Sequence, residues 1–194
     1  MALISRQEAL SAGRRVVYNS SVTARDLLIK SASAAPQQKF DVFLSHSIHD
    51  AETILGVRAI LQADGLSVYV DWIDDPQLDR RSVSRATANV LRERMKKCSS
   101  LIFVTSDSSP TSKWMPWELG FFDGMQGPRI AIMPLEDSTP GSQGQEYLEL
   151  YPAVERLPST LAGHSALFAV RGTYYREYLS LKELAAGSQT FRRT

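Results

Sequence analysis

Five short apolar runs, separated by stretches long enough for helices, constrain the fold of this chain most. They are FDVFLS (40–45), LSVYV (66–70), SLIFVT (100–105), RIAIMPL (129–135) and ALFAV (166–170). Each run is nearly continuous in β-branched and other apolar residues, which is typical of strands buried on both faces. Such strands alternate with helices in parallel sheets. The sequence therefore predicts an α/β fold with a doubly wound, five-stranded parallel sheet.

Helical signals lie between these runs. Asp50 is a candidate N-cap for a helix that stops at Gly65, and a second helix is expected after Ser82. The spacing predicts a buried face on this second helix made of Val83, Ala86, Val90 and Met95. Further helices are expected over 114–124 and 174–186. The segment 136–163 contains STPGSQGQ and further prolines, and it is expected to be irregular.

Residues 1–38 differ in character from the rest. The run SRQE from Ser5 is typical of a capping box that opens a helix. SVTARDLLIK (21–30) favours another helical turn or two, and SASAAPQQ (31–38) is typical of a linker. We therefore expect an N-terminal helical extension and linker over 1–38, followed by one domain over 39–194.

Charge and composition exclude several classes of protein. The chain has 22 Lys plus Arg and 21 Asp plus Glu, a net charge of +1, so no overall field draws it to nucleic acid or to an anionic membrane. No stretch approaches the roughly 18 apolar residues of a membrane span. The single cysteine, Cys98, cannot form an internal disulfide, which fits a reducing compartment. We expect a cytoplasmic protein that binds neither nucleic acid nor membrane.

In open parallel sheets, ligands bind beyond the carboxyl ends of the strands, where the strand order reverses. The residues that follow the first three predicted strands are Ser45, His46, Ser47, Asp71, Trp72, Ser106 and Asp107. The charged loop DWIDDPQLDRR (71–81) is a candidate lid. Within it Arg80 could approach a pyrophosphate, although a solvated loop face is the alternative.

The stretch SKWMPWELGFF (112–122) places one carboxylate, Glu118, among large aromatic residues. Pro116 suits the first turn of a helix, and Trp114 and Glu118 are four residues apart, so they share a helix face. A carboxylate beside indole rings at the mouth of the crevice is a candidate catalytic group. The alternative is that Glu118 only complements the helix dipole and that the aromatic residues belong to the core.

The segments FDVFLSHS, SVYVDWIDD, SLIFVTSDS and SKWMPWEL together resemble the TIR (Toll/interleukin-1 receptor) domain family, over about residues 39–186. The helix motif of that family is roughly S-x-W-C-x-x-E-L, and four residues fall on it: Ser112, Trp114, Glu118 and Leu119. Met115 stands where cysteine is frequent. The resemblance implies a flavodoxin-like sheet and cleavage of the nicotinamide–ribose bond of NAD+ by Glu118.

The products implied by the resemblance are nicotinamide and ADP-ribose or a cyclic isomer of it, used as a signal in antiphage immunity. NAD+ would be a substrate, with no cofactor. The resemblance also implies self-association through TIR domains, in which the loop 71–81 of one copy completes the site of the next, and a downstream effector that responds to a nucleotide product.

Individual roles follow from residue chemistry. Trp72 or Trp114 could stack on the pyridinium ring, and Ser45 and Ser47 could bind phosphate or ribose or merely cap the strand end. His46 is more often a satisfied buried histidine than a catalyst. The substrate-binding candidates are Ser45, His46, Ser47, Asp71, Trp72, Arg80, Ser112 and Trp114. Three scattered histidines and one cysteine give no metal-ligand spacing.

Other functions remain as alternatives. The main one is a non-catalytic TIR scaffold or adaptor, which would not need a positioned glutamate. A phosphoacceptor receiver is disfavoured because VRG, not a lysine, follows the last predicted strand. A nucleoside deoxyribosyltransferase-like enzyme also uses a glutamate on a similar fold. The chain has no P-loop, no G-x-G-x-x-G after a strand and no nucleophile elbow.

Overall fold

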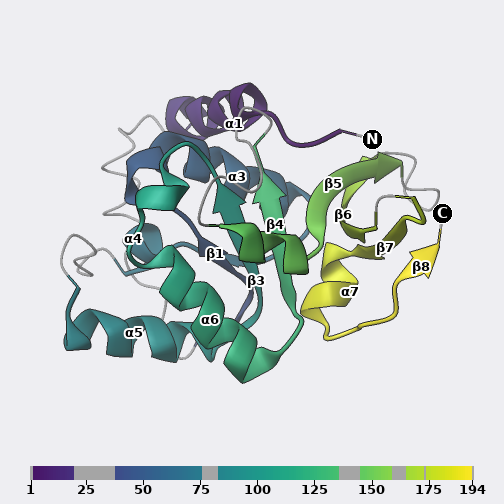
Figure 1. Ribbon diagram of the computed structural model, residues 1–194. Coiled ribbons are helices and arrows are strands. Elements are labelled where there is room, and N and C mark those ends of the chain that lie inside the picture. Colours follow the sequence, from purple (N-terminus) through teal and green to yellow (C-terminus); the bar gives the residue numbers. More distant parts are fainter. Residues whose placement is uncertain are drawn as a thin grey trace.

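One sheet runs through the described part of the chain, residues 2–19, 38–75, 83–135, 145–158, 165–172 and 174–193 of this computed structural model. Over these residues the sheet has eight strands in the order β2-β1-β3-β4-β5-β6-β7-β8 (Figure 1). The first five strands in this order pair with their neighbours in parallel. The order 2-1-3-4-5 is the flavodoxin-like one. The predicted α/β class is confirmed, and the sheet is larger than the five strands expected.

The parallel strands are β1 (Phe40–Ser45), β2 (Val68–Tyr69), β3 (Cys98–Thr105), β4 (Ile130–Pro134) and β5 (Ala153–Pro158). Four of them lie within or close to predicted runs. The fifth, β5, falls in the segment that was expected to be irregular. Its sequence AVERLP carries two charged residues, so it lacks the continuous apolar pattern of the other four. The short 3₁₀ helix η3 (Glu146–Leu150) precedes it.

The carboxyl-terminal part of the sheet is antiparallel, which corrects two predictions. The run 166–170 forms β6 (Ser165–Arg171), which pairs antiparallel with β5, because the connection between the two strands is too short for a parallel crossover. The helix expected over 174–186 is instead β7 (Glu177–Ser180) followed by α7 (Leu181–Ala185). A capping box begins α7 at Ser180. The last strand, β8 (Arg192–Arg193), pairs with β7.

Helices cover both faces of the parallel strands (Figure 1). On one face α3 (Ala51–Ala63) packs against the sheet, and α1 (Arg6–Asn19) lies over α3. On the other face lie α5 (Arg85–Met95) and α6 (Met115–Gln126). Two separate clusters of buried apolar side chains result, one on each face. This is the doubly wound arrangement that the sequence predicts.

The buried face of α5 differs from the predicted one. Ser84 caps this helix, and its hydroxyl accepts a bond from the backbone N–H of Thr87 at 3.0 Å. Val83 therefore precedes the helix and is 66% exposed, and Val90 is 36% exposed. The residues that α5 buries are Thr87, Leu91, Arg94 and Met95.

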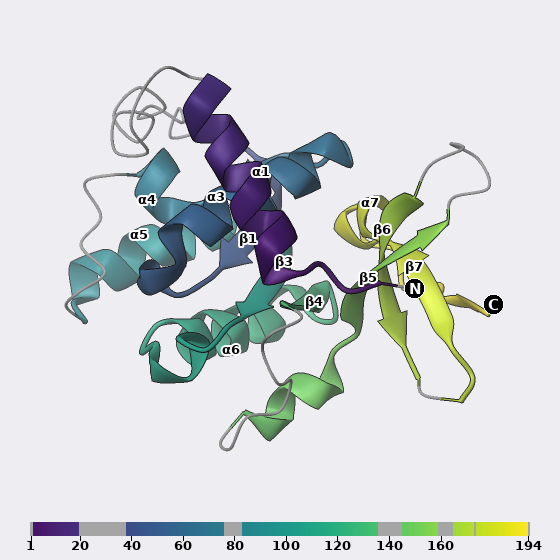
Figure 2. The ribbon, with the colours of Figure 1, turned by 90° about the horizontal axis from the view of Figure 1, so that it is seen from above.

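The N-terminal helix is tied to the core. Ser5 caps α1 by accepting a bond from the N–H of Glu8 at 3.0 Å, as SRQE predicts, but the Glu8 carboxylate pairs with Arg156 of β5 at 2.6 Å. Ahead of the helix, Ala2 bridges to Arg156 and the fully buried Ile4 bridges to Leu135 at the end of β4. Figure 2 shows this segment running from α1 toward β5. The runs 21–30 and 31–37 lie outside the described residues.

Candidate active site

The strand order reverses between β1 and β3, so the connections leaving these neighbouring strands run to opposite sides. A crevice is expected at such a switch point. Two short 3₁₀ helices follow the strand ends there, η1 (Ile48–Asp50) after β1 and η2 (Ser109–Thr111) after β3. The amino-terminal turn of α6 lies directly after η2.

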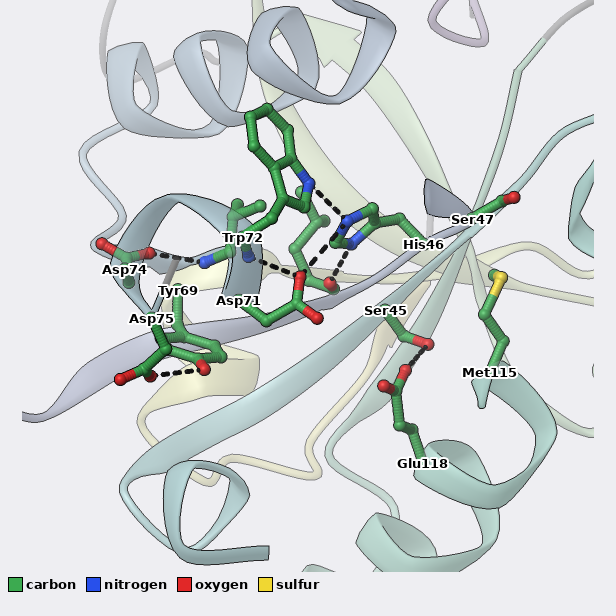
Figure 3. Close-up of polar contacts among 12 residues, drawn as sticks. Ser45, His46, Ser47, Tyr69, Asp71, Trp72, Asp74, Asp75, Met115 and Glu118 are labelled. Atoms are coloured by element: carbon green, nitrogen blue, oxygen red, sulfur yellow. Dashed lines mark hydrogen bonds and ion pairs between the residues drawn. The ribbon is translucent and has the colours of Figure 1, made fainter. Parts of the chain in front are cut away.

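Glu118 meets the end of β1 at this point. The hydroxyl of Ser45 donates to Oε2 of Glu118 at 2.6 Å, and both residues are fully buried (Figure 3). A distance this short is typical of a bond from a hydroxyl to an ionised carboxylate. Glu118 lies in the first turn of α6, where the positive end of the helix dipole favours negative charge. Both features stabilise the ionised carboxylate, whose removal from water would otherwise cost free energy.

A cavity of about 280 Å³ is formed by residues close to this pair in the chain, although neither Ser45 nor Glu118 lines it. Its lining comes from the two 3₁₀ helices and the segment before α6, namely Ser47, Ile48, His49, Thr111, Ser112, Lys113 and Trp114. One ammonium group, several hydroxyls and an indole therefore face a common space. Trp114 is only 5% exposed, and its carbonyl accepts the N–H of Glu118 at 2.8 Å, so it links the cavity to the carboxylate.

His46, Asp71 and Trp72 form a different group on the other side of β1. Successive side chains of a strand point to opposite faces, and Figure 3 shows His46 turned away from Ser45. The indole N–H of Trp72 donates to Nε2 of His46 at 2.7 Å, while Nδ1 of His46 lies 2.8 Å from the carbonyl of Leu44. Because an indole can only donate, Nε2 is the acceptor and Nδ1 carries the proton.

These contacts hold the three residues together on the side of β1 away from Glu118. Asp71 Oδ1 accepts the backbone N–H of Trp72 at 2.8 Å and lies 3.5 Å from Nε2 of His46. The Trp72 ring packs against the apolar cluster on the α3 face, not the face that holds Glu118. Of the two tryptophans predicted to stack on a ligand, only Trp114 borders the cavity.

The first half of the candidate lid is fixed to α3 and to the backbone that follows β2. Residues 71–74 form the short helix α4 (Asp71–Asp74), and Asp74 pairs with Arg58 of α3 at 3.1 Å. Its other carboxylate oxygen accepts the N–H of Val70 at 2.7 Å. Burial raises the pKa of Asp74, and Arg58 opposes this shift. This half of the loop is therefore anchored and is no free lid.

Asp75 anchors the same segment to the opposite face. Arg94 of α5 binds both carboxylate oxygens of Asp75, each at 2.6 Å, and the Tyr69 hydroxyl donates to the same carboxylate at 2.8 Å. Burial is the largest cause of a strongly raised pKa of Tyr69, so this hydroxyl stays protonated. The second half of the loop, with Arg80, lies outside the described residues.

Several residues at the site were not predicted. His49 and Thr111 line the cavity and lie close to the runs SHS and SKW in the sequence, and Lys113, which also lines it, is the middle residue of SKW. Asp50 is the N-cap residue of α3, as predicted, but its side chain makes no cap bond. It instead accepts bonds from the Ser106 and Ser108 hydroxyls at 2.5 and 2.6 Å, which joins the two walls of the cavity.

Among the residues that the structure describes there is no metal cluster, no membrane-spanning helix and no reactive cysteine. No group of three or more His, Cys, Asp or Glu side chains in these ranges could hold a metal ion. No helix in the same ranges is both long and apolar enough to cross a membrane. Cys98 is buried, and burial raises the pKa of its thiol well above the ordinary value, which makes it unreactive.

Two curated proteins are similar to this chain. One, from Bacillus cereus, is described as "Probable 3' cyclic ADP-D-ribose synthase ThsB'" and is 46% identical over 142 residues, covering 72% of this chain and 73% of that protein. The other, from Cytobacillus dafuensis, is described as "Putative cyclic ADP-D-ribose synthase TIR2" and is 32% identical over 123 residues, covering 62% of this chain and 32% of that protein. No protein-family model matches the chain.

Proposed function

Because this chain belongs to the family of bacterial TIR-domain proteins that these two relatives represent, we propose that it cleaves the nicotinamide–ribose bond of NAD+ and closes the remaining ADP-ribose into a cyclic isomer. The observation that carries the proposal is the buried Ser45–Glu118 pair at the switch point, beside a cavity with a tryptophan in its wall. The cyclic product would serve as a signal in antiphage immunity.

The chemistry needs one well-placed carboxylate. Nicotinamide leaves as a neutral molecule from a cationic pyridinium, so no general acid is required, and positive charge develops on the ribose as in glycoside cleavage. Glu118 stabilises that charge, an electrostatic effect of about 3 to 4 kcal/mol in sites of this kind. Attack by a hydroxyl of the same molecule gives a cyclic product, and attack by water gives ADP-ribose; either route releases one proton.

The cavity offers groups that suit the rest of the substrate. The indole of Trp114 can contact the cationic ring, an interaction of roughly 0.5 to 2 kcal/mol. Lys113 supplies a positive charge for a phosphate, and the hydroxyls of Ser47 and Ser112 supply hydrogen bonds to phosphate or ribose. A volume of about 280 Å³ matches one end of a dinucleotide, not the whole of it.

Turnover of NAD+ is the direct test. We expect the purified chain to consume NAD+ and to release equal amounts of nicotinamide and a second product with the mass of ADP-ribose minus water, both measured by chromatography and mass spectrometry. A second product with the mass of ADP-ribose would mean hydrolysis in place of cyclisation. If no NAD+ is consumed at any protein concentration while the chain still self-associates, the non-catalytic scaffold is the better account.

Specific activity is expected to rise with protein concentration. Glu118 is fully buried in a single chain, so a substrate reaches it only after the surrounding side chains move. We propose that self-association drives this change. The measurement is initial rate per mole of protein over a dilution series, with the oligomeric state followed by light scattering. A rate per mole that is constant across the monomer–oligomer transition would contradict this.

A further inference from the structure

We propose that Ser45 is a positioning residue, whose hydroxyl fixes the orientation and the charge of the Glu118 carboxylate and does not bind the substrate. This inference rests on the proposed function, because it assigns a role within the same site. It replaces the sequence-based expectation that Ser45 donates to a phosphate or to ribose.

The geometry leaves Ser45 little freedom. It is the last residue of β1 and lies opposite Phe103 of β3 in the parallel ladder, so hydrogen-bonded backbone holds it in place. Its side chain is fully buried and does not line the cavity. A hydroxyl has one proton to donate, and Ser45 gives it to Oε2 of Glu118 at 2.6 Å. That proton cannot also serve a substrate phosphate.

The energetics explain why such a donor matters. Removing a carboxylate from water disfavours its ionised form, and a hydrogen bond donated to it restores part of that free energy. The reaction uses the ionised form of Glu118. Ser45 therefore acts through Glu118: without its hydroxyl, the carboxylate would take up a proton at higher pH and would lose one of the bonds that orient it.

Ser47 provides the matched comparison, two residues further along the chain. It lines the cavity, and its hydroxyl accepts the N–H of His49 at 3.4 Å. Its hydroxyl proton is therefore suited to a bound substrate. The two serines should differ in which kinetic constant they control, although they are chemically identical.

The experiment compares Ser45→Ala and Ser47→Ala with the wild-type chain, measuring kcat and KM for NAD+ from pH 4 to 9. Ser45→Ala is expected to lower kcat about 10- to 100-fold, the factor for a hydrogen bond to a charged group. Its KM should stay within about threefold of the wild-type value, since the serine does not touch the substrate. The acidic limb of its kcat profile should move to higher pH by about one to two units. Ser47→Ala should instead raise KM and leave the acidic limb in place.

Each outcome decides the matter. A Ser45→Ala chain with wild-type kcat and acidic limb overturns the inference, and so does one whose KM rises at unchanged kcat; both leave the proposed function standing. A wild-type chain that never cleaves NAD+ refutes the proposed function and this role with it. If Ser45→Ala does not fold, Ser45→Cys is the second variant, because cysteine is similar in size to serine and its thiol is a weaker hydrogen-bond donor. Its kcat should fall and its acidic limb should move to higher pH, both by less than in Ser45→Ala. Wild-type kinetics in Ser45→Cys would then overturn the inference.

Discussion

Glu118→Gln is expected to lower kcat for NAD+ cleavage by about 10²- to 10³-fold. The amide has nearly the shape of the carboxylate, and its oxygen can still accept the Ser45 hydroxyl, so the local structure should persist. What is lost is the negative charge that stabilises the developing positive charge on the ribose. Because that charge develops only in the transition state, KM should change much less than kcat. Initial rates of nicotinamide release over a range of NAD+ concentrations measure both constants.

Glu93→Gln is the matched control for this substitution. Glu93 is an exposed residue of α5 that pairs with Lys96 at 2.8 Å, and exposed pairs of this kind contribute little to stability. The rates of NAD+ cleavage by Glu93→Gln should therefore stay within about twofold of the wild-type values. Thermal unfolding adds a second readout, since replacing a fully buried carboxylate should leave the melting temperature of Glu118→Gln equal or higher. More than about a tenth of wild-type kcat in Glu118→Gln would contradict an electrostatic role for this residue.

The fold could be predicted as far as each strand carried its own apolar pattern. The strands β1 to β4 have that pattern, whereas β5 does not, because it places Glu155 and Arg156 in the sheet. These charges are tolerated since Glu155 pairs with Arg176 and Arg156 pairs with Glu8. Both partners are distant in sequence, so local periodicity could not reveal the strand.

The position of the candidate site at the switch point could be predicted from the sequence. Which of its residues lie on which face of the sheet was harder to predict. Strand alternation alone separates Ser45 from His46, and it could have placed only one of them beside Glu118. The position of the Trp72 ring could not be predicted in this way. Its ring is directed by the course of α4, which is anchored by ion pairs to Arg58 and Arg94 on two other helices. Contacts of this kind depend on tertiary structure and leave no local signal.

Gly56→Ala is expected to lower the free energy of unfolding by about 3 kcal/mol or more. In α3 this glycine faces α1 so closely that an added Cβ would lie 1.7 Å from the carbonyl oxygen of Ala9 and 2.8 Å from the backbone nitrogen of Gly13. Backbone atoms of a packed helix cannot move aside as a flexible side chain can. The two helices would have to separate, which would uncover part of the buried cluster on the α3 face. Urea unfolding followed by circular dichroism measures the loss.

Gly124→Ala, in α6, is the control that makes this result specific to the helix contact. A Cβ at Gly124 would meet no heavy atom within 4 Å outside its own helix turns, so the substitution adds no clash. Alanine also restricts the unfolded chain and favours helix, and this variant should gain about 0.4 to 1 kcal/mol. A lower free energy of unfolding for Gly56→Ala together with a higher one for Gly124→Ala would establish that α1 is held against α3 by backbone contact. Equal urea midpoints for Gly56→Ala and the wild-type chain would instead mean that α1 does not pack against α3 in solution.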